Sequence, residues 1–272
     1  LQAFAMHAAI ALERSQLLDE ARRSQELHVS VQVGQSIQAS FLPSRLPDVP
    51  GYEVAAWWEP AEAVSGDYYD LLKLPDGRLG LVVADVSGHG VGPSLIMASV
   101  RAMLHVVART HSEPDQIVSL LNETITPDLQ EGRFITFLIV ALDPRTHELT
   151  FANAGHGPAL HFHRAEGRFE SLDSTGLPIG FAPEGGIPCG HTLTLEPGDL
   201  LLLATDGAIE LRNGDDDMFG RERLEHLIRE HRALPASELL AVLRRAITEF
   251  HPRPHPPDDV TLLLLERKMR QA

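Results

Sequence analysis

The sequence predicts a layered α+β domain with antiparallel sheet at its centre, preceded by a helical segment. Two observations favour this class. From Gly51 onward, short runs rich in aliphatic and aromatic residues alternate with turns that contain Gly or Pro. Stretches with apolar residues at helical spacing interrupt these runs twice, so the order is strands, helices, strands, helices and a last strand. Such an order is typical of layered α+β domains.

Residues 1–44 are expected to form a helix that Pro43 and Pro47 end. Two sets of apolar or small residues recur there at helical spacing: Phe4, Ala8, Ala11, Ser15 and Leu18, then Leu27, Val31, Gly34, Ile37 and Phe41. The spacing allows a helix packed on its own domain, or a signalling linker that dimerises and connects an upstream sensor domain. The chain starts at Leu1 inside this pattern, so we expect a fragment of a longer protein and favour the linker.

The remaining elements follow from hydrophobic periodicity and turn signals. Strands are expected at residues 52–58, 68–74 and 78–86, helices at 93–107 and 115–129, strands at 134–142 and 149–154, short strands within 158–198, a buried strand at 200–204, helices at 219–231 and 236–250, and a buried strand at 260–265. Side chains alternate across a strand. One of Tyr68 and Tyr69, and one of Trp57 and Trp58, is therefore expected to face the core.

The composition excludes several classes of protein. Thirty-eight acidic against 23 basic residues give a formal net charge of −15, which disfavours a nucleic-acid or anionic-membrane surface and suits a protein that holds divalent cations. The single cysteine, Cys189, excludes an internal disulfide and a Cys-based zinc site, and favours a cytoplasmic location. No apolar run approaches the ~20 residues that span a bilayer, and no signal peptide is visible.

Acidic motifs at strand ends are the main clue to chemistry. Five occur: Ser65-Gly66-Asp67-Tyr68-Tyr69-Asp70, Ala84-Asp85-Val86-Ser87-Gly88-His89-Gly90, Thr205-Asp206-Gly207, Asp215-Asp216-Asp217 and Asp258-Asp259-Val260-Thr261. Carboxylates are the ligands that Mg²⁺ and Mn²⁺ prefer. Two such ions ~4 Å apart would hold a bridging water and lower its pKa, which suits hydrolysis of a phosphate ester. The sequence thus predicts a hard-metal site assembled from distant segments.

Several other polar residues are expected to be structural. Asp70 would brace a turn, His156 would hydrogen-bond a loop, Asp199 would sit in a hairpin turn, and Glu210 would fix the turn around Asp206. Residues 215–217 are expected to be a solvated loop, with a substrate-facing flap or a third metal ligand as the alternative. A zinc site at His161 and His163, which share a strand face, is not expected.

The motifs resemble those of a known family. In order along the chain they are Gln38 with Phe41-Leu42-Pro43, Gly66-Asp67-Tyr68-Tyr69-Asp70, Ala84-Asp85-Val86-Ser87-Gly88-His89-Gly90, Asn153-Ala154-Gly155-His156, Gly176-Leu177-Pro178-Ile179-Gly180, Leu195 with Pro197-Gly198-Asp199, Thr205-Asp206-Gly207 with Glu210, and Asp258-Asp259-Val260-Thr261. Over residues 36–266 the chain resembles the PPM-type metal-dependent protein phosphatases, in their bacterial SpoIIE/RsbU-like branch. The resemblance implies a four-layer α-β-β-α sandwich over residues 45–268, with two Mn²⁺ or Mg²⁺ ions at one end of the sheets.

The resemblance also implies a ligand set. Asp85 would bridge both metals, the Val86 carbonyl would bind one, and Asp67 would hold one mostly through water. Asp206 and Asp258 would hold the other, with Asp259 as the alternative to Asp258. Asp85 and Asp67 would thereby position the attacking water. Family members from eukaryotes place a His two residues after the bridging Asp as general acid. Here His89 is four residues on, so that role is not transferred.

By this resemblance the expected function is hydrolysis of a phosphoserine or phosphothreonine protein by a metal-activated water. The expected substrate is a phosphorylated anti-sigma-factor antagonist of the STAS type. The family also lets N-terminal helices act on the metal site, which favours residues 1–44 as a dimerising signalling linker. Two alternatives remain open: a non-catalytic binding module of the same fold, and a phosphatase that acts on small phosphate esters.

Overall fold

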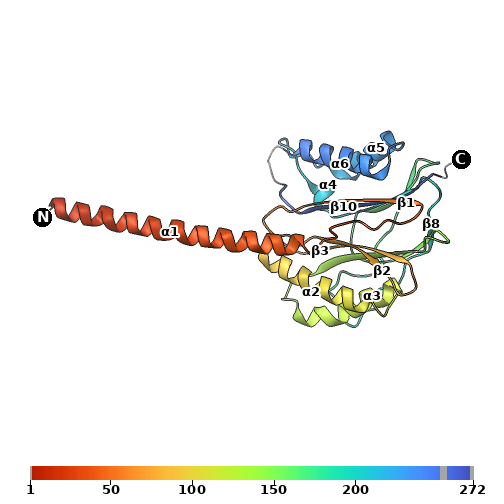
Figure 1. Cartoon of the computed structure of the whole chain (residues 1–272), viewed down its shortest axis with the longest axis horizontal. Coiled ribbons are helices and arrows are strands. Elements are labelled where there is room, and N and C mark those ends of the chain that lie inside the picture. The colour runs from red at the N-terminus through yellow and green to blue at the C-terminus, as the bar shows by residue number, and fades with distance from the viewer. Residues whose placement is uncertain (1, 252–255, 270–272) are drawn as a thin grey trace.

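The computed structural model describes residues 2–251 and 256–269, apart from the side chains at 2–5, 7–12, 15, 24 and 26–28. Two antiparallel sheets pack face to face, and helices cover both outer faces, which makes four layers (Figure 1). The first sheet has the order β1 (Tyr52–Glu59), β10 (Val260–Arg267), β9 (Leu200–Ala204), β6 (Ala159–His163) and β7 (Arg168–Ser171). The second has the order β2 (Tyr68–Lys73), β3 (Leu79–Val86), β4 (Ile135–Leu142), β5 (Glu148–Ala154) and β8 (Leu193–Thr194). The predicted α-β-β-α sandwich is confirmed.

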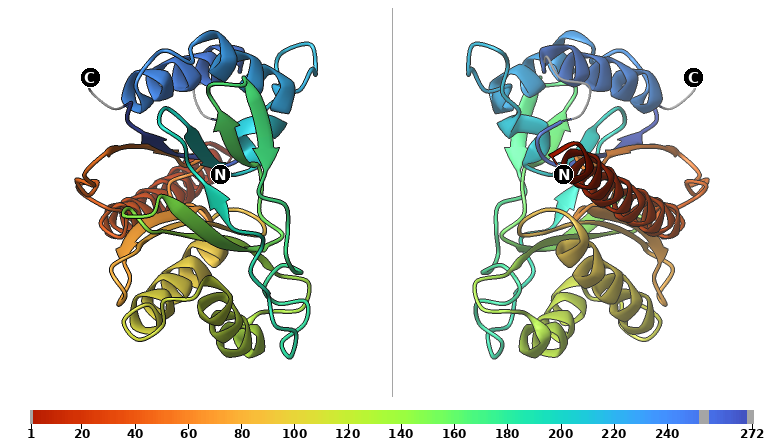
Figure 2. Two further views of the ribbon diagram at one scale, coloured as in Figure 1. Left: turned by 90° about the vertical axis from the view of Figure 1, so that its right-hand side faces the viewer. Right: turned by 90° about the vertical axis from the view of Figure 1, so that its left-hand side faces the viewer.

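The helices fall into two groups, one on each outer face (Figures 1 and 2). The second sheet is covered by α2 (Val91–Val107) and α3 (Pro114–Ile125), which continues into the 3-10 turn η1 (Thr126–Asp128); the first sheet is covered by α4 (Gly207–Glu210), α5 (Gly220–Glu230) and α6 (Ala236–Phe250). The predicted start of α2 at Pro93 is two residues late, because Gly90 adopts φ 86° and lets the helix begin at Val91.

Three layers of buried side chains hold the sandwich together: one under α2 and α3, one between the sheets, and one under α4 to α6. Because every central strand contributes side chains to two of these layers, its sequence is apolar at consecutive positions. All five residues of β9 and all eight of β10 are buried. The continuous apolar runs at these positions in the sequence therefore reflect burial on both faces.

Burial on both faces also corrects the expectation for the paired aromatic residues. Tyr68 lies in the layer under α2 and α3, and Tyr69 lies between the sheets; they are 0% and 8% exposed, so both belong to a core. Trp57 is buried under the helices of the first sheet, and Trp58 packs, partly buried, against the layer between the sheets. Alternation was predicted correctly, but neither face of the strand is open to water.

Helix α1 (Gln2–Ala39) runs away from the sandwich as a single rod (Figure 1). It ends four residues before Pro43, the residue predicted to stop it, and Phe41 and Leu42 just beyond it pack against the cores. Of the first apolar set, the side chains of Phe4, Ala8, Ala11 and Ser15 lie outside the described residues. Within the described part of the chain, no helix combines the length and apolarity that crossing a membrane requires.

Candidate metal centre

One end of the sandwich collects the acidic motifs. In the second sheet, β2 and β3 pair with Tyr68 opposite Ala84, so Asp67 and Asp85 flank that pair. In the first sheet, Leu262 of β10 lies opposite Ala204 of β9, so the segments just before β10 and just after β9 come together. These segments carry Asp258, Asp259 and Asp206, and together with Asp67 and Asp85 we call them the strand-end carboxylates. The topology thus brings five of the predicted residues to one edge.

Asp67 is the deepest of these side chains, at 2% exposed. Its Oδ2 accepts hydrogen bonds from the hydroxyls of Thr205 (2.8 Å) and Thr261 (2.6 Å), one from each central strand region of the first sheet. The Thr205 hydroxyl in turn accepts from the Thr261 backbone amide at 2.9 Å. Asp67 therefore joins the two sheets at this end.

Asp259 is also buried, at 4% exposed, but its carboxylate has different partners. Its Oδ1 accepts from the Ala61 amide and its Oδ2 from the Gly66 amide, both at 2.8 Å. Both carboxylate oxygens therefore fix the loop that leads into Asp67. Asp258 has an exposed side chain whose Oδ1 accepts from the Asp259 amide at 2.9 Å. Of the two, the Asp258 carboxylate is more exposed and accepts fewer hydrogen bonds among the described residues.

The backbone around the strand-end carboxylates is tightly packed. A Cβ on Gly66 would lie 2.8 Å from the carbonyl oxygen of Val86 and 3.4 Å from Asp85 Oδ1. A Cβ on Gly207 would lie 2.0 Å from the carbonyl oxygen of Asp259. Two glycines of the motifs are thus required because chains from different strands touch there. The contact also holds the Val86 carbonyl at the same edge as Asp85.

Burial and mutual repulsion both raise the pKa values of these carboxyls, and burial has the larger effect. Burial, then the charges of Asp206, Asp258 and Asp259, raise the pKa of Asp85 to about 7, although a hydrogen bond with Asp67 works in the opposite direction. Burial and the charges of Asp85 and Asp259 raise the pKa of Asp67 well above its usual range. The pKa of Asp206 is raised by burial and by Glu210, and that of Asp258 by burial and by Asp206. Like charges are gathered here without a compensating Lys or Arg among these causes.

This donor set fits a hard divalent cation. It consists of oxygen atoms, it is anionic, and its carboxyls resist ionisation until positive charge is supplied. The carboxylates are spread out: within the described residues, the group of three ligand atoms that lie within 4.8 Å of one another is formed instead by His161, His163 and Glu170. A spread-out set of carboxylates matches sites in which Mg²⁺ keeps several waters between itself and the protein.

The residues expected to be structural make bracing contacts. Asp70 binds the Tyr68 hydroxyl and lies 2.7 Å from His105 Nε2 on α2. His156 is buried, lies 2.8 Å from the Thr136 hydroxyl through Nδ1, and has its pKa lowered to about 4 by burial. Asp199 is buried and accepts from the amides of Arg164 and Glu196. Residues 215–217 form an exposed turn whose amides at 215 and 217 bond to Asn213 Oδ1.

The contacts of His89 and Gln38 near this edge were not predicted from the sequence. Exposed His89 binds Glu62 Oε1 through Nδ1 at 2.6 Å, and its charge lowers the pKa of Asp258, so it lies beside the strand-end carboxylates. The Gln38 side chain donates from Nε2 to the Ser65 carbonyl (2.6 Å) and accepts at Oε1 from the Ser65 amide (2.8 Å). The Gln38 motif and the Gly88-His89-Gly90 turn were visible, but their partners lie 27 residues away.

Comparison with known proteins finds a matching family model and similar phosphatases. The family model described as Stage II sporulation protein E (SpoIIE) matches residues 75–268. Phosphoserine phosphatase RsbU of Bacillus subtilis (strain 168) is 27% identical over 250 residues, which cover 90% of this chain and 72% of RsbU. Phosphoserine phosphatase RsbP of the same organism is 23% identical over 220 residues, which cover 79% of this chain and 52% of RsbP.

Two solved structures share the fold. The SiaA-PP2C domain of Pseudomonas aeruginosa superposes with a TM-score of 0.77 at 24% identity, over 89% of this chain and 98% of that chain. The RsbU and RsbW domains of Rv1364c from Mycobacterium tuberculosis superpose with a TM-score of 0.71 at 28% identity, over 83% of this chain and 62% of that chain.

The sandwich and its relatives define the class: a PPM-type (PP2C-like) serine/threonine phosphatase. Within that class the family can also be assigned, because the SpoIIE family model matches well over half of the sequence. The chain belongs to the SpoIIE family. The predicted resemblance to the SpoIIE/RsbU-like branch is therefore confirmed.

Proposed function

We propose that the chain is a Mg²⁺- or Mn²⁺-dependent phosphatase that removes phosphate from phosphoserine or phosphothreonine in a protein. The observation that carries the proposal is the convergence of the strand-end carboxylates at one edge of the sandwich. In the proposed site Asp85 and the Val86 carbonyl would be among the groups that hold the two ions. Asp67 would help to hold one ion, and Asp206 and Asp258 would hold the other. We favour Asp258 over Asp259 as the ligand, because each oxygen of Asp259 already accepts a backbone amide of the loop before Asp67.

The chain's own residues would position the reactants. The hydroxyls of Thr205 and Thr261 orient Asp67, and Asp259 fixes the segment that carries it. Asp206 and Asp258 are exposed, so the site is open to a phosphorylated segment of another protein. Bound Mg²⁺ or Mn²⁺ would supply a water of lowered pKa and offset charge on the phosphoryl oxygens. No covalent intermediate on a side chain is required.

The proposed substrate is a phosphorylated anti-sigma-factor antagonist of the STAS type, in the cytoplasm. The family resemblance supports this, and the names of RsbU and RsbP state phosphoserine phosphatase activity for those relatives. The single thiol, Cys189, suits a reducing compartment. The chain covers about half of RsbP, so an upstream sensor domain in the whole protein is part of the proposal.

We expect the purified chain to dephosphorylate a phosphoserine STAS protein in Mn²⁺ or Mg²⁺, and to lose that activity in EDTA. A non-catalytic binding module would not bind Mn²⁺ in calorimetry with a dissociation constant below about 1 mM. It would also turn over neither the phosphoprotein nor p-nitrophenyl phosphate. Turnover of p-nitrophenyl phosphate alone, with the phosphoprotein untouched, would instead favour a small-ester phosphatase.

Control by α1 is the second part of the proposal. Gln38 lies in the last turn of α1, is 4% exposed, and its amide satisfies both backbone groups of Ser65. The Ser65 hydroxyl accepts from the Asp67 amide at 2.9 Å. A shift of α1 would therefore act on Asp67 through two hydrogen-bonded steps. We call α1 a lever because its movement would reach the proposed metal site along this path. We place it in a linker at residues 1–44.

Gln38→Ala is expected to lower phosphatase activity about tenfold or more, since buried Ser65 loses both partners at a cost of about 1–3 kcal/mol per unsatisfied group. The measurement is kcat and the Mn²⁺ concentration for half activity, because misplaced Asp67 should weaken metal binding. Gln35→Ala, on the exposed side of the same helix, is the matched control. Equal activity of the two variants would contradict a lever through Gln38.

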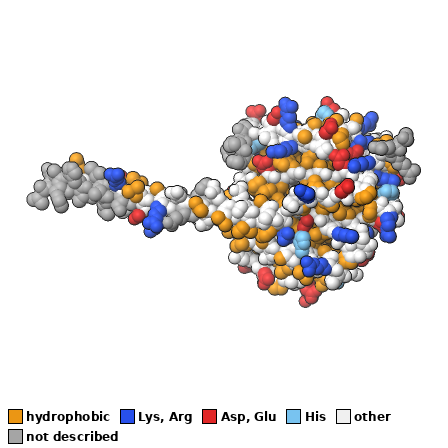
Figure 3. Space-filling model, viewed as in Figure 1, with side chains coloured by type: hydrophobic (Ala, Val, Ile, Leu, Met, Phe, Trp, Pro, Cys, Tyr) orange, Lys and Arg blue, Asp and Glu red, His pale blue; other side chains and the backbone are white. Residues whose placement is uncertain are grey.

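A homodimer through α1 is proposed because apolar side chains remain exposed at its base. Val33 and Ile37 of α1, and Val91 and Leu95 of α2, are each more than half exposed. Figure 3 shows hydrophobic side chains gathered where α1 meets the body of the molecule. A groove between the helices is lined by Val31, Gly34, Phe41 and Leu95, among others. A monomer in sedimentation velocity at about tens of micromolar would count against the dimer.

A further inference from the structure

A second cluster of metal-ligating side chains lies at the far end of the sandwich. His161 and His163 alternate with Leu160 and Phe162 on β6. Leu160 and Phe162 face the helices, so the two imidazoles point between the sheets. Glu170 lies on the neighbouring strand β7, directly opposite His161 in the register. Asp199 precedes β9 and Asp206 follows it, so with a rise of ~3.3 Å per residue this cluster is roughly 20 Å from the strand-end carboxylates.

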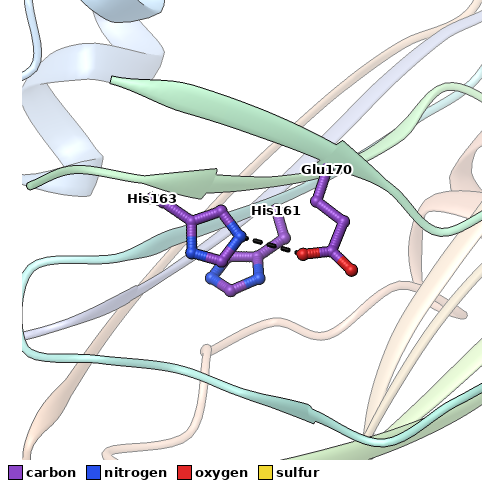
Figure 4. Close-up of side chains that lie close together, drawn as sticks. All are labelled: His161, His163 and Glu170. Atoms are coloured by element: carbon purple, nitrogen blue, oxygen red, sulfur yellow. Dashed lines mark hydrogen bonds and ion pairs between the residues drawn. The ribbon is translucent and has the colours of Figure 1, made fainter. Parts of the chain in front are cut away.

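The three side chains converge on one point, as Figure 4 shows. One ligand atom each from His161, His163 and Glu170 lies within 4.8 Å of the other two. His163 Nε2 is 2.9 Å from Glu170 Oε2, and the two imidazole rings are tilted by 39° with centroids 3.9 Å apart. Ligand atoms on one tetrahedral Zn²⁺ lie roughly 3.3 Å apart for bonds of about 2.0 Å, so only small side-chain rotations separate this cluster from such a site.

His161 is prepared as a ligand by its other neighbour. Its Nε2 lies 2.8 Å from Asp199 Oδ2, and Asp199 is fixed by the amides of Arg164 and Glu196. Asp199 accepts at that oxygen, so Nε2 carries the proton and Nδ1 keeps its lone pair. The side chain of His161 is 0% exposed, and Nδ1 has no hydrogen-bond partner among the described atoms. A carboxylate that orients a histidine in this way is the usual surrounding of a metal-binding imidazole.

Glu170 provides the negative charge. Burial raises the pKa of Glu170, but hydrogen bonds from His191 and His163 outweigh this effect and lower the pKa to about 2. The carboxylate therefore stays ionised. His191 Nε2 lies 2.9 Å from Glu170 Oε1, on the exposed side, and Arg168 approaches Glu170 Oε2 at 3.5 Å. The cluster thus offers imidazole nitrogens and one carboxylate, a softer set than the all-oxygen carboxylates at the other end.

We propose that His161, His163 and Glu170 form a structural site for Zn²⁺ or a similar borderline transition ion, with His191 or water as the fourth ligand. The ion would bind β6 to the edge strand β7 and hold the segment around residue 191 against them. The site is separate from the proposed catalytic ions in both position and ligand chemistry. Its occupation would stabilise the sheet edge and leave the phosphatase reaction unchanged.

The test is metal uptake by the full chain in excess Mg²⁺, which occupies the oxygen site. Zn²⁺ should bind with one equivalent by calorimetry and raise the Tm, and Co²⁺ should give the visible absorption of a tetrahedral site with nitrogen ligands. His163→Gln should abolish these signals and keep Mn²⁺-dependent phosphatase activity. Asp199→Asn should weaken Zn²⁺ binding about 10–100-fold by disturbing the orientation of His161.

His226→Gln is the matched control, since His226 lies exposed on α5 and away from the cluster. It should bind Zn²⁺ like the unaltered chain. Glu170→Gln, which changes the half-buried edge of the cluster, repeats the test if His163→Gln does not fold. The proposal is overturned if the unaltered chain takes up no Zn²⁺ in excess Mg²⁺, or if His163→Gln and Glu170→Gln bind it as the unaltered chain does.

Discussion

Asp85→Asn is expected to reduce phosphatase activity by about 10³-fold or more while the metal-free protein becomes no less stable. In the proposed site Asp85 would be a ligand of both ions, and an amide in its place would remove that shared anionic ligand. In the metal-free fold the charged form of Asp85 is disfavoured, because burial and the charges of Asp206 and Asp258 raise its pKa to about 7. A neutral side chain relieves this repulsion above the ordinary pKa of Asp.

Two measurements separate this expectation from simple unfolding. Activity on a phosphoserine protein is measured in saturating Mn²⁺, and Tm is measured with and without the ion. The unaltered chain should gain stability from Mn²⁺ and Asp85→Asn should gain little, by the linkage of binding to folding. Asp215→Asn, in the exposed turn, is the matched control and should behave like the unaltered chain. Full activity in Asp85→Asn would remove Asp85 from the site.

Gly207→Ala is expected to destabilise the fold by about 3 kcal/mol or more, although Ala normally favours a helix over Gly. A Cβ at this position would lie 2.0 Å from the Asp259 carbonyl oxygen and 3.1 Å from its carbon, and both atoms belong to the backbone. The segment before β10 would have to move, and Asp258 would move with it. Activity should therefore fall even where the variant still folds.

Gly214→Ala provides the control for this second variant. No heavy atom lies within 4 Å of a Cβ built on Gly214, so the change should stay within about 0.5 kcal/mol in urea unfolding. The comparison isolates the close approach at Gly207 from the general effect of replacing a glycine. Equal unfolding midpoints for the two variants would contradict the prediction, because they would show that the segment before β10 can move away from a Cβ at residue 207 without loss of folding free energy.

The layered fold could be predicted because the spacing of apolar residues along the sequence indicates which segments are helices and which are strands. β9 and β10 lie within a residue or two of the predicted ranges, since a continuous apolar run bounded by turns has few other interpretations. The burial of both Tyr68 and Tyr69 could not be predicted, because it depends on a second sheet that the local pattern does not reveal. The end of α1 at Ala39 depends on its docking against residue 65.

The candidate site was predictable in its residue types and less so in its contacts. The positions of Asp67 and Asp85 follow from strand ends, which are local signals. The different surroundings of Asp258 and Asp259 follow from amides almost 200 residues away, and no local pattern carries that information. The roles assigned to the strand-end carboxylates stay predictions until metal and substrate are tested. The His161 cluster was dismissed because spacing on one strand did not show Glu170 opposite.

The position of β10 has a consequence for how the molecule comes into being. β10 is the last strand in the described part of the chain, yet it lies between β1 and β9, and Asp259 just before it accepts hydrogen bonds from the amides of residues 61 and 66. During synthesis from the N-terminus, β1 lacks its partner β10 until residues 260–267 have emerged. The acidic edge consequently matures last. A nascent chain that ends before residue 258 would lack part of the proposed metal site.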